Sequence, residues 1–218
     1  MKHTFLTIST CLVGLILAFP PITSAIELPP EEVYAGHKLI DDWNTEAAEH
    51  FTKTLLKKYP KSGDAYFLKA RVEFFKGNHD LATKILKQVT GNHREVHELK
   101  NLVYETYEET KLFTTSESKH FIYRYQKGSD EILVHYATKV LEKSYKILGK
   151  IFNYYPKEKV LVEFYPNRES FSKISPLTLD DIAISGTVAL CKYNRIMMIS
   201  PGSLVRGYNW MDTLSHRS

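Results

Sequence analysis

The sequence predicts an α + (α+β) fold, in which N-terminal helical hairpins are followed by an α+β half. Small and apolar residues recur at a spacing of 34 residues in the first half, as in stacked helical hairpins. After a polar joint at residues 114–119 the apolar period changes from that of helices to that of strands. Strand and helix patterns then alternate to the end of the 218 residues.

Residues 1–25 have the features of a secretory signal peptide. Lys2 provides a positive start, residues 5–19 are largely apolar, and Thr23 and Ala25 are small residues at cleavage positions. We therefore expect cleavage after Ala25 and an exported protein, periplasmic or extracellular. The alternative is an uncleaved N-terminal anchor, for which the apolar run is short.

The composition is ordinary for a soluble globular protein, with 43% hydrophobic and 25% charged residues. The net charge of +4 comes from scattered lysines, without an aromatic-studded RNA motif or a basic recognition helix, so we expect no nucleic-acid partner. Once the signal is removed, we expect no membrane partner. Cleavage would also leave Cys191 as a lone cysteine, which we interpret as a small core residue.

Residues 26–115 are predicted to form helical repeats. The pairs that lie 34 residues apart are Gly36 and Ala70, Asn44 and Asn78, Ala48 and Ala82, and Leu55 and Val89. This period, with small residues where antiparallel helices approach closely, resembles tetratricopeptide repeats. Departures from the family pattern are charged residues at Lys69 and Glu73 and an arginine, Arg94, in place of the second proline. We expect two repeats and a third helix at residues 95–110.

Such a short array buries little apolar surface, since at least three repeats are normally needed for stability. Either a neighbouring domain covers it or it dimerises. The resemblance implies a surface that binds a protein or peptide. The alternative is a helical spacer that supports the second half.

Residues 116–218 are predicted to form an α+β half. Alternating aromatic residues at 120–126 indicate a half-buried strand, and residues 130–152 show a long amphipathic helix. The later elements are a strand at 159–166, a short helix after an Asn167 cap, two strands around a Tyr193-Asn194 turn, and a helix begun by an Asn209 cap.

The histidine pair His93 and His97 has a metal-ligand spacing of one helical turn. Glu95, however, points away from His93 on a helix, so the pair does not form a zinc-peptidase motif. We interpret it as a solvated helix start.

The segments LVEFYPNRESF, ISGTVALCKYNRIMMISP and GYNWMDTLSH resemble tetratricopeptide-linked proteins with a peptidase MA-like (gluzincin) domain. The family implies a His-Glu-x-x-His zinc site that hydrolyses peptide bonds. The resemblance places the first zinc ligand at His216, but Arg217 stands where the general base belongs. The second histidine and the third ligand would lie beyond Ser218, so we expect a truncated or frame-shifted relative that binds no zinc and has no catalytic residue.

The resemblance also suggests a substrate-binding strand. We predict that the segment Ile196, Met197, Met198, Ile199 and Ser200 forms a sheet edge that pairs with an extended substrate. The competing hypothesis is a non-enzymatic scaffold in which the α+β half covers the helical repeats. Neither is decided by the sequence.

Overall fold

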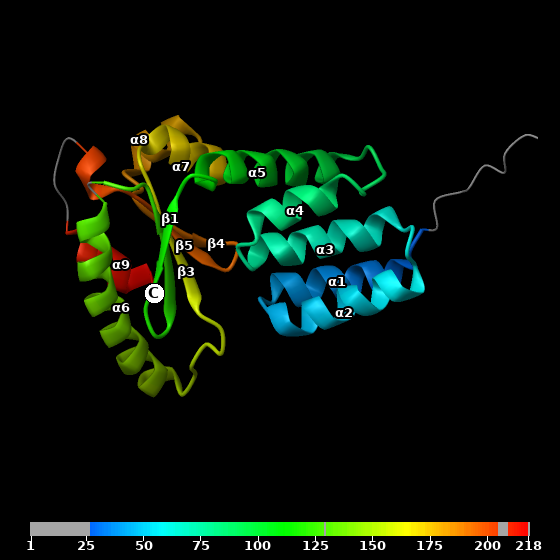
Figure 1. The fold of residues 1–218 in the computed structure, drawn as a ribbon, viewed down its shortest axis with the longest axis horizontal. Coiled ribbons are helices and arrows are strands. Elements are labelled where there is room, and N and C mark those ends of the chain that lie inside the picture. The colour runs from blue at the N-terminus through cyan, green and yellow to red at the C-terminus, as the bar shows by residue number, and fades with distance from the viewer. Residues whose placement is uncertain (1–26, 129, 205–208, 218) are drawn as a thin grey trace, which may run out of the picture.

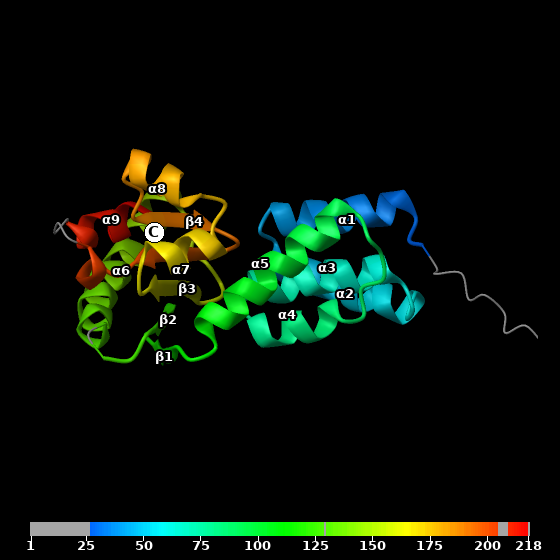
Figure 2. The ribbon, with the colours of Figure 1, turned by 90° about the horizontal axis from the view of Figure 1, so that it is seen from above.

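The computed structural model describes residues 27–128, 130–204 and 209–217, so the predicted signal segment lies outside the described part. The chain has a helical part and a part built around a mixed sheet, which lie side by side in both views (Figures 1 and 2). No helix among the described residues is long and apolar enough to cross a membrane.

The helical part consists of two antiparallel hairpins and one long helix. Its elements are α1 (Pro30–Asp41), α2 (Thr45–Lys58), α3 (Gly63–Phe75), α4 (His79–Leu86) and α5 (Arg94–Thr110). Helix α2 begins where the Asn44 side chain accepts a bond from Ala47 N, and α3 where Ser62 accepts one from Ala65 N. These caps satisfy backbone donors that a helix start leaves free.

The 34-residue spacing marks the positions where these helices touch, as predicted. Ala48, Ala70 and Ala82 are fully buried, and a Cβ at Gly36 would stand 2.6 Å from Leu68 Cδ1. The third helix is also confirmed as α5. The two charged departures from the repeat pattern pair with each other, since Lys69 Nζ lies 2.5 Å from Glu73 Oε1 one turn away.

The second part holds a five-stranded sheet in the order β1-β2-β3-β5-β4. Its strands are β1 (Thr114–Glu117), β2 (Phe121–Tyr125), β3 (Val160–Tyr165), β4 (Ala189–Lys192) and β5 (Arg195–Ile199). Strand β3 runs parallel to β2 and β5, whereas β1 and β4 pair antiparallel with their neighbours. Tyr193 and Asn194 join β4 to β5 with φ values of 55° and 58°, as a type I′ hairpin turn requires.

The two faces of the sheet have different covers. Helices α6 (Glu131–Phe152) and α9 (Trp210–Arg217) pack on one face, over a core that includes Val162, Phe164 and Leu214. Helices α7 (Arg168–Ile174) and α8 (Leu179–Ser185) pack on the other, near the end of α5; η1 (Pro201–Ser203) follows β5. The second face also meets the turn between α3 and α4, as described below.

The structure corrects one prediction and adds two elements. Strand β5 lies between β3 and β4, so residues 196–200 do not form a sheet edge. All five of them are buried, because apolar covers lie on both faces. Strand β1 lies in the segment that we predicted as a polar joint, and α8 follows a Thr178–Asp181 capping box that the sequence analysis did not identify.

Candidate functional site

Helix α3 packs against both α1 and α5, and one depression is lined by residues of α1 and α5; we call the surface that these three helices share the inner surface. We define this inner surface by residues from all three helices: Tyr34, His37, Asp41, Phe67, Arg71 and Glu95. Tyr34 is 71% exposed, which is a high value for an aromatic side chain beside a depression. That depression, of about 480 Å³, is lined by Leu28, Pro30, Val33, Tyr34, His37 and Glu95.

Three polar side chains are organised on the inner surface. Arg71 Nη2 donates to Asp41 Oδ1 at 2.8 Å, and its Nη1 contacts His37 Nδ1. Burial lowers the pKa of His37, and the positive charge of Arg71 lowers it further. A neutral His37 accepts at Nδ1 from the guanidinium, which is always a donor. The guanidinium is therefore fixed in place between α1 and α3.

A second polar cluster joins the helical part to the sheet, and we call it the joint: His79, Thr110, Arg124, Glu163 and Arg195. Arg195 Nη1 lies 2.7 Å from His79 Nε2, and His79 Nδ1 lies 3.1 Å from Thr110 Oγ1. Thr110 Oγ1 in turn donates to the Thr106 carbonyl at 2.7 Å. Because Arg195 must donate, His79 accepts at Nε2 and carries its proton on Nδ1.

Glu163 occupies the centre of the joint and has no exposed side-chain surface. Its Oε2 lies 3.1 Å from Arg195 Nε and accepts from the Tyr165 hydroxyl at 2.6 Å. Its Oε1 accepts from Arg124 Nη1 at 3.3 Å, and the same nitrogen donates to the Gly77 carbonyl at 2.7 Å. Two arginines, one from each of the strands that flank β3, thus hold the Glu163 carboxylate against the α3–α4 turn.

The charge states in the joint follow from this geometry. Burial lowers the pKa of His79 to about 3, and the neighbouring arginines lower it in the same direction, whereas Glu163 opposes them. Burial acts to raise the pKa of Glu163, but its charged and hydrogen-bonding neighbours, Arg195 above all, lower it, and the net shift is downward. At neutral pH the joint therefore contains a neutral histidine and an ionised carboxylate.

Aromatic side chains complete the joint. The Arg195 guanidinium lies 4.6 Å from the Phe74 ring centroid and 5.7 Å from that of Tyr193. Tyr193, at the tip of the β4–β5 hairpin, also contacts Phe74 and Phe75 of α3 with ring centroids 5.3 and 5.8 Å away. The hairpin tip thus extends the apolar core of the helical part.

No pattern in the sequence predicted the joint. Glu163 and Arg195 lie within strand patterns, and their partners on the helices are far away in sequence. The available signal was Glu163, a charged residue in an apolar strand that was predicted to be buried. Because buried charges are normally paired, a partner for Glu163 could have been expected.

The structure does not bring the predicted site residues together. Met197 and Ile199 face α7 and α8, Ile196 and Met198 face α6 and α9, and Ser200 Oγ donates to Asp130 Oδ1 at 2.7 Å. His216 lies within α9, but its side chain is outside the described part. The Asn209 cap is confirmed, because Asp212 N donates to Asn209 Oδ1 at 3.4 Å.

The other histidines that the sequence singled out have local roles. His93 is the N-cap residue of α5, and His97 Nε2 lies 2.6 Å from Asn92 Oδ1. Among the residues that the structure describes, no group of three or more His, Cys, Asp or Glu side chains is placed to hold a metal ion. The described residues therefore do not form the zinc site that the gluzincin resemblance implies.

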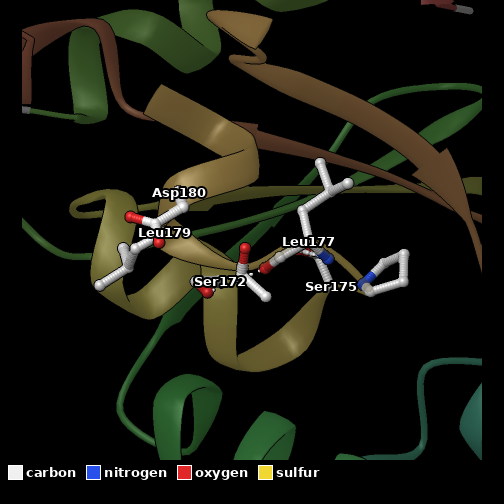
Figure 3. Close-up of a pocket in the computed structure, with 7 residues that line it drawn as sticks. Ser172, Ser175, Leu177, Leu179 and Asp180 are labelled. Carbon is white, nitrogen blue, oxygen red and sulfur yellow. Dashed lines mark hydrogen bonds between the residues drawn. The ribbon is translucent and has the colours of Figure 1, made fainter. Parts of the chain in front are cut away.

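A further depression, of about 600 Å³, lies beside the loop between α7 and α8 (Figure 3). Its hydroxyl groups bond to the loop itself. Ser172 Oγ donates to the Leu177 carbonyl at 2.8 Å, and Ser175 Oγ accepts from Leu177 N at 3.2 Å. These bonds shape the loop, so we assign no ligand to this depression.

A family model for Iml2/tetratricopeptide repeat protein 39 matches residues 8–121, just over half of the chain. The chain belongs to this Iml2/tetratricopeptide repeat protein 39 family. The match covers α1 to α5, and it starts within the segment predicted as a signal peptide. No curated protein matches the chain, and no solved structure does. Membership supports a tetratricopeptide-like scaffold, a class that generally mediates protein interactions.

Proposed function

We propose that the protein is a non-enzymatic scaffold that binds a peptide segment of a partner protein on its inner surface. The observation that carries this proposal is that the inner surface holds both a highly exposed tyrosine, Tyr34, and an arginine, Arg71, that is held in place by His37 and Asp41. Tyrosine and arginine, with tryptophan, are the side chains enriched at binding hot spots. The sheet, held by the joint, acts as a support that fixes the helices around this surface.

The chemistry of the inner surface favours a segment with both apolar and charged side chains. Tyr34 and the rim of the depression provide apolar contact, with the His37 ring 5.9 Å from that of Phe67. Glu95 adds a carboxylate to the lining of the depression, and Arg71 contacts His37, which also lines it. A helix fixed in place loses little entropy on binding, which raises affinity for a given contact area.

The test is a selection of binding peptides from a random library with the purified chain, followed by affinity measurements on variants. Tyr34→Ala and Arg71→Ala should each weaken binding of selected peptides by at least about tenfold. Lys57→Ala on the exposed side of α2 is the matched control and should leave affinity unchanged. Peptides that bind equally to all four proteins would contradict the assignment of the inner surface.

Export and the peptidase-like half remain predictions. The charged start and apolar run of residues 1–25 support export, and an N-terminal sequence of secreted protein beginning at Ile26 would test it. Stoichiometric zinc in the purified chain, lost on His216→Ala, would contradict the expectation that this chain binds no zinc and would show that other residues complete a site with His216.

A further inference from the structure

His37, on the inner surface, contacts Arg71 through a bond that only a neutral imidazole can make. Its Nδ1 accepts from Arg71 Nη1, and it cannot accept once both ring nitrogens carry hydrogen. The same ring lines the depression of about 480 Å³ and lies 5.9 Å from the Phe67 ring. The charge of His37 therefore affects both the guanidinium and the depression.

Two further contacts hold Arg71 less firmly. Asp41 Oδ1 accepts from Nη2 at 2.8 Å, but 61% of the Asp41 side chain is exposed, and exposed ion pairs contribute little. The Phe75 ring centroid lies 5.8 Å from the guanidinium, and contact with a ring face gives no hydrogen-bond direction. The half-buried His37 is thus the contact that fixes the orientation of the guanidinium.

Charged groups from three helices act on His37. Burial lowers its pKa most and Arg71 of α3 lowers it further, whereas Glu95 of α5, Asp41 of α1 and Asp64 of α3 raise it. The net shift is downward from 6.5, so the ring takes up its proton below that pH. The imidazolium then repels the guanidinium and is attracted to Glu95, which lines the same depression.

We propose that the inner surface releases its peptide as the pH falls, because protonation of His37 frees Arg71. This inference rests on the proposed function and names how that site is regulated. A bound peptide covers the depression and removes water from the imidazole, and loss of water disfavours the charged ring. Binding therefore favours neutral His37, and by linkage a proton on His37 opposes binding.

The linkage also gives the range and size of the effect. Well above pH 6.5 His37 is neutral in the free chain, so the affinity should be constant there. Below the pKa of His37 in the free chain, the affinity should fall by up to about tenfold for each pH unit, since one proton must leave before the peptide binds. A carboxylate of the peptide at His37 would reverse the sign. The proposal therefore implies a partner segment that places no carboxylate there.

The test uses peptides selected on the purified chain at neutral pH, with blocked ends and without His, Asp or Glu, so that the peptide itself does not titrate. Dissociation constants are measured by fluorescence anisotropy between about pH 7.5 and 5, where circular dichroism shows that the chain stays folded. His37→Gln keeps an amide oxygen that accepts from Arg71 at every pH, so this variant should lose the fall in affinity. His50→Gln, at an exposed histidine of α2, is the matched control and should keep it.

A measurement on the free chain needs no peptide. The Nε–H signal of Arg71 in a proton–nitrogen NMR spectrum, identified by its absence in Arg71→Lys, should shift as the pH falls below 6.5. It should not shift in His37→Gln. An unchanged signal in the unmodified chain would overturn the inference.

The binding data separate this inference from the proposed function. An affinity that stays constant, rises as the pH falls, or falls equally in His37→Gln would overturn the regulation and leave peptide binding in place. A selection that yields no peptide would overturn the proposed function, and the regulation with it.

Discussion

Glu163 is held by two arginines and a tyrosine hydroxyl at a place with no access to water. A buried ion of this kind depends on its partners, because loss of one leaves an uncompensated charge in a low-dielectric interior. Arg195 is in the same position, since its side chain is also fully buried. Removal of either residue therefore leaves the other as an uncompensated buried charge.

Glu163→Leu should lower the free energy of unfolding by about 3–5 kcal/mol, because it leaves Arg195 buried without its carboxylate. The double variant Glu163→Leu/Arg195→Met should recover much of that loss, since it replaces the pair with apolar side chains of similar size. Urea unfolding of the three proteins measures both. Glu98→Leu, at an exposed ion pair with Arg94, is the control and should change stability by less than about 0.5 kcal/mol.

His79 should make stability depend on pH. Its pKa is lowered from 6.5 to about 3 in the folded chain, so the unfolded chain binds the proton first as pH falls. The stabilisation is fully present above pH 6.5 and declines between pH 6.5 and 3, at up to about 1.4 kcal/mol per pH unit. Unfolding between pH 6.5 and 5 should show this slope, largely removed in His79→Gln.

His37 contributes in the same direction, because burial and Arg71 lower its pKa as well. His37→Gln should remove a smaller part of the slope, as its side chain is only half-buried. An undiminished slope in His79→Gln would show that the pKa of His79 is not lowered in the folded chain.

At the scale of elements, the helix contacts of the repeats depend on small side chains. Ala48 and Ala82 are fully buried where α2 and α4 meet their neighbours. Ala48→Leu or Ala82→Leu should overpack these contacts and cost roughly 1–3 kcal/mol, measured by thermal or urea unfolding. Ala47→Leu, half-buried on the next position, is the control. A change near zero at both buried sites would argue against close packing there.

The β4–β5 hairpin offers a second test of an element. Asn194 has a φ of 58°, which glycine adopts without strain and β-branched residues avoid. Asn194→Gly should leave the folded state at least as stable, whereas Asn194→Val should cost about 1–3 kcal/mol. The comparison requires both proteins to be measured in the same unfolding assay. Equal stability of the two would mean that the turn changes its conformation.

The elements with strong periodicity were predictable from the sequence. Helix α6, strands β2 and β3 and the β4–β5 hairpin show clear patterns of period 3.6 or 2. Strand β1 was missed because its residues are polar and it gains its place only by pairing with β2. Helix α8 was missed because its seven residues are too few to show a period.

The position of β5 was unpredictable for a different reason. Its apolar pattern is the same for an edge strand covered on both faces and for an interior strand, so only the pairing with β3 distinguishes them. The joint was also beyond local patterns, because Arg195 and His79 meet across the fold. The repeat spacing predicted the helix contacts at Ala48 and Ala82, but it predicted neither the residues of the inner surface nor the ion pair of Arg71 with Asp41.

At the scale of the whole molecule, the joint predicts that the helical part and the sheet unfold together. The chain has two tryptophans, Trp43 beside α2 and Trp210 in α9, so each reports on one part. The Trp210→Phe variant keeps only Trp43 and reports on the helical part, and the Trp43→Phe variant keeps only Trp210 and reports on the sheet part. The urea midpoints of both, followed by fluorescence, should equal the midpoint from far-UV circular dichroism. Separate midpoints would show that the joint does not couple the two parts.

The same joint limits how this chain can lengthen in evolution. A hairpin duplicated between α4 and α5 would move His79 away from Thr110 and would leave the sheet attached to only one of them. A hairpin added ahead of Pro30 would disturb none of these bonds. Longer relatives should therefore have gained repeats ahead of α1, and the distance in sequence from the α3–α4 turn to β1 should be nearly constant among them.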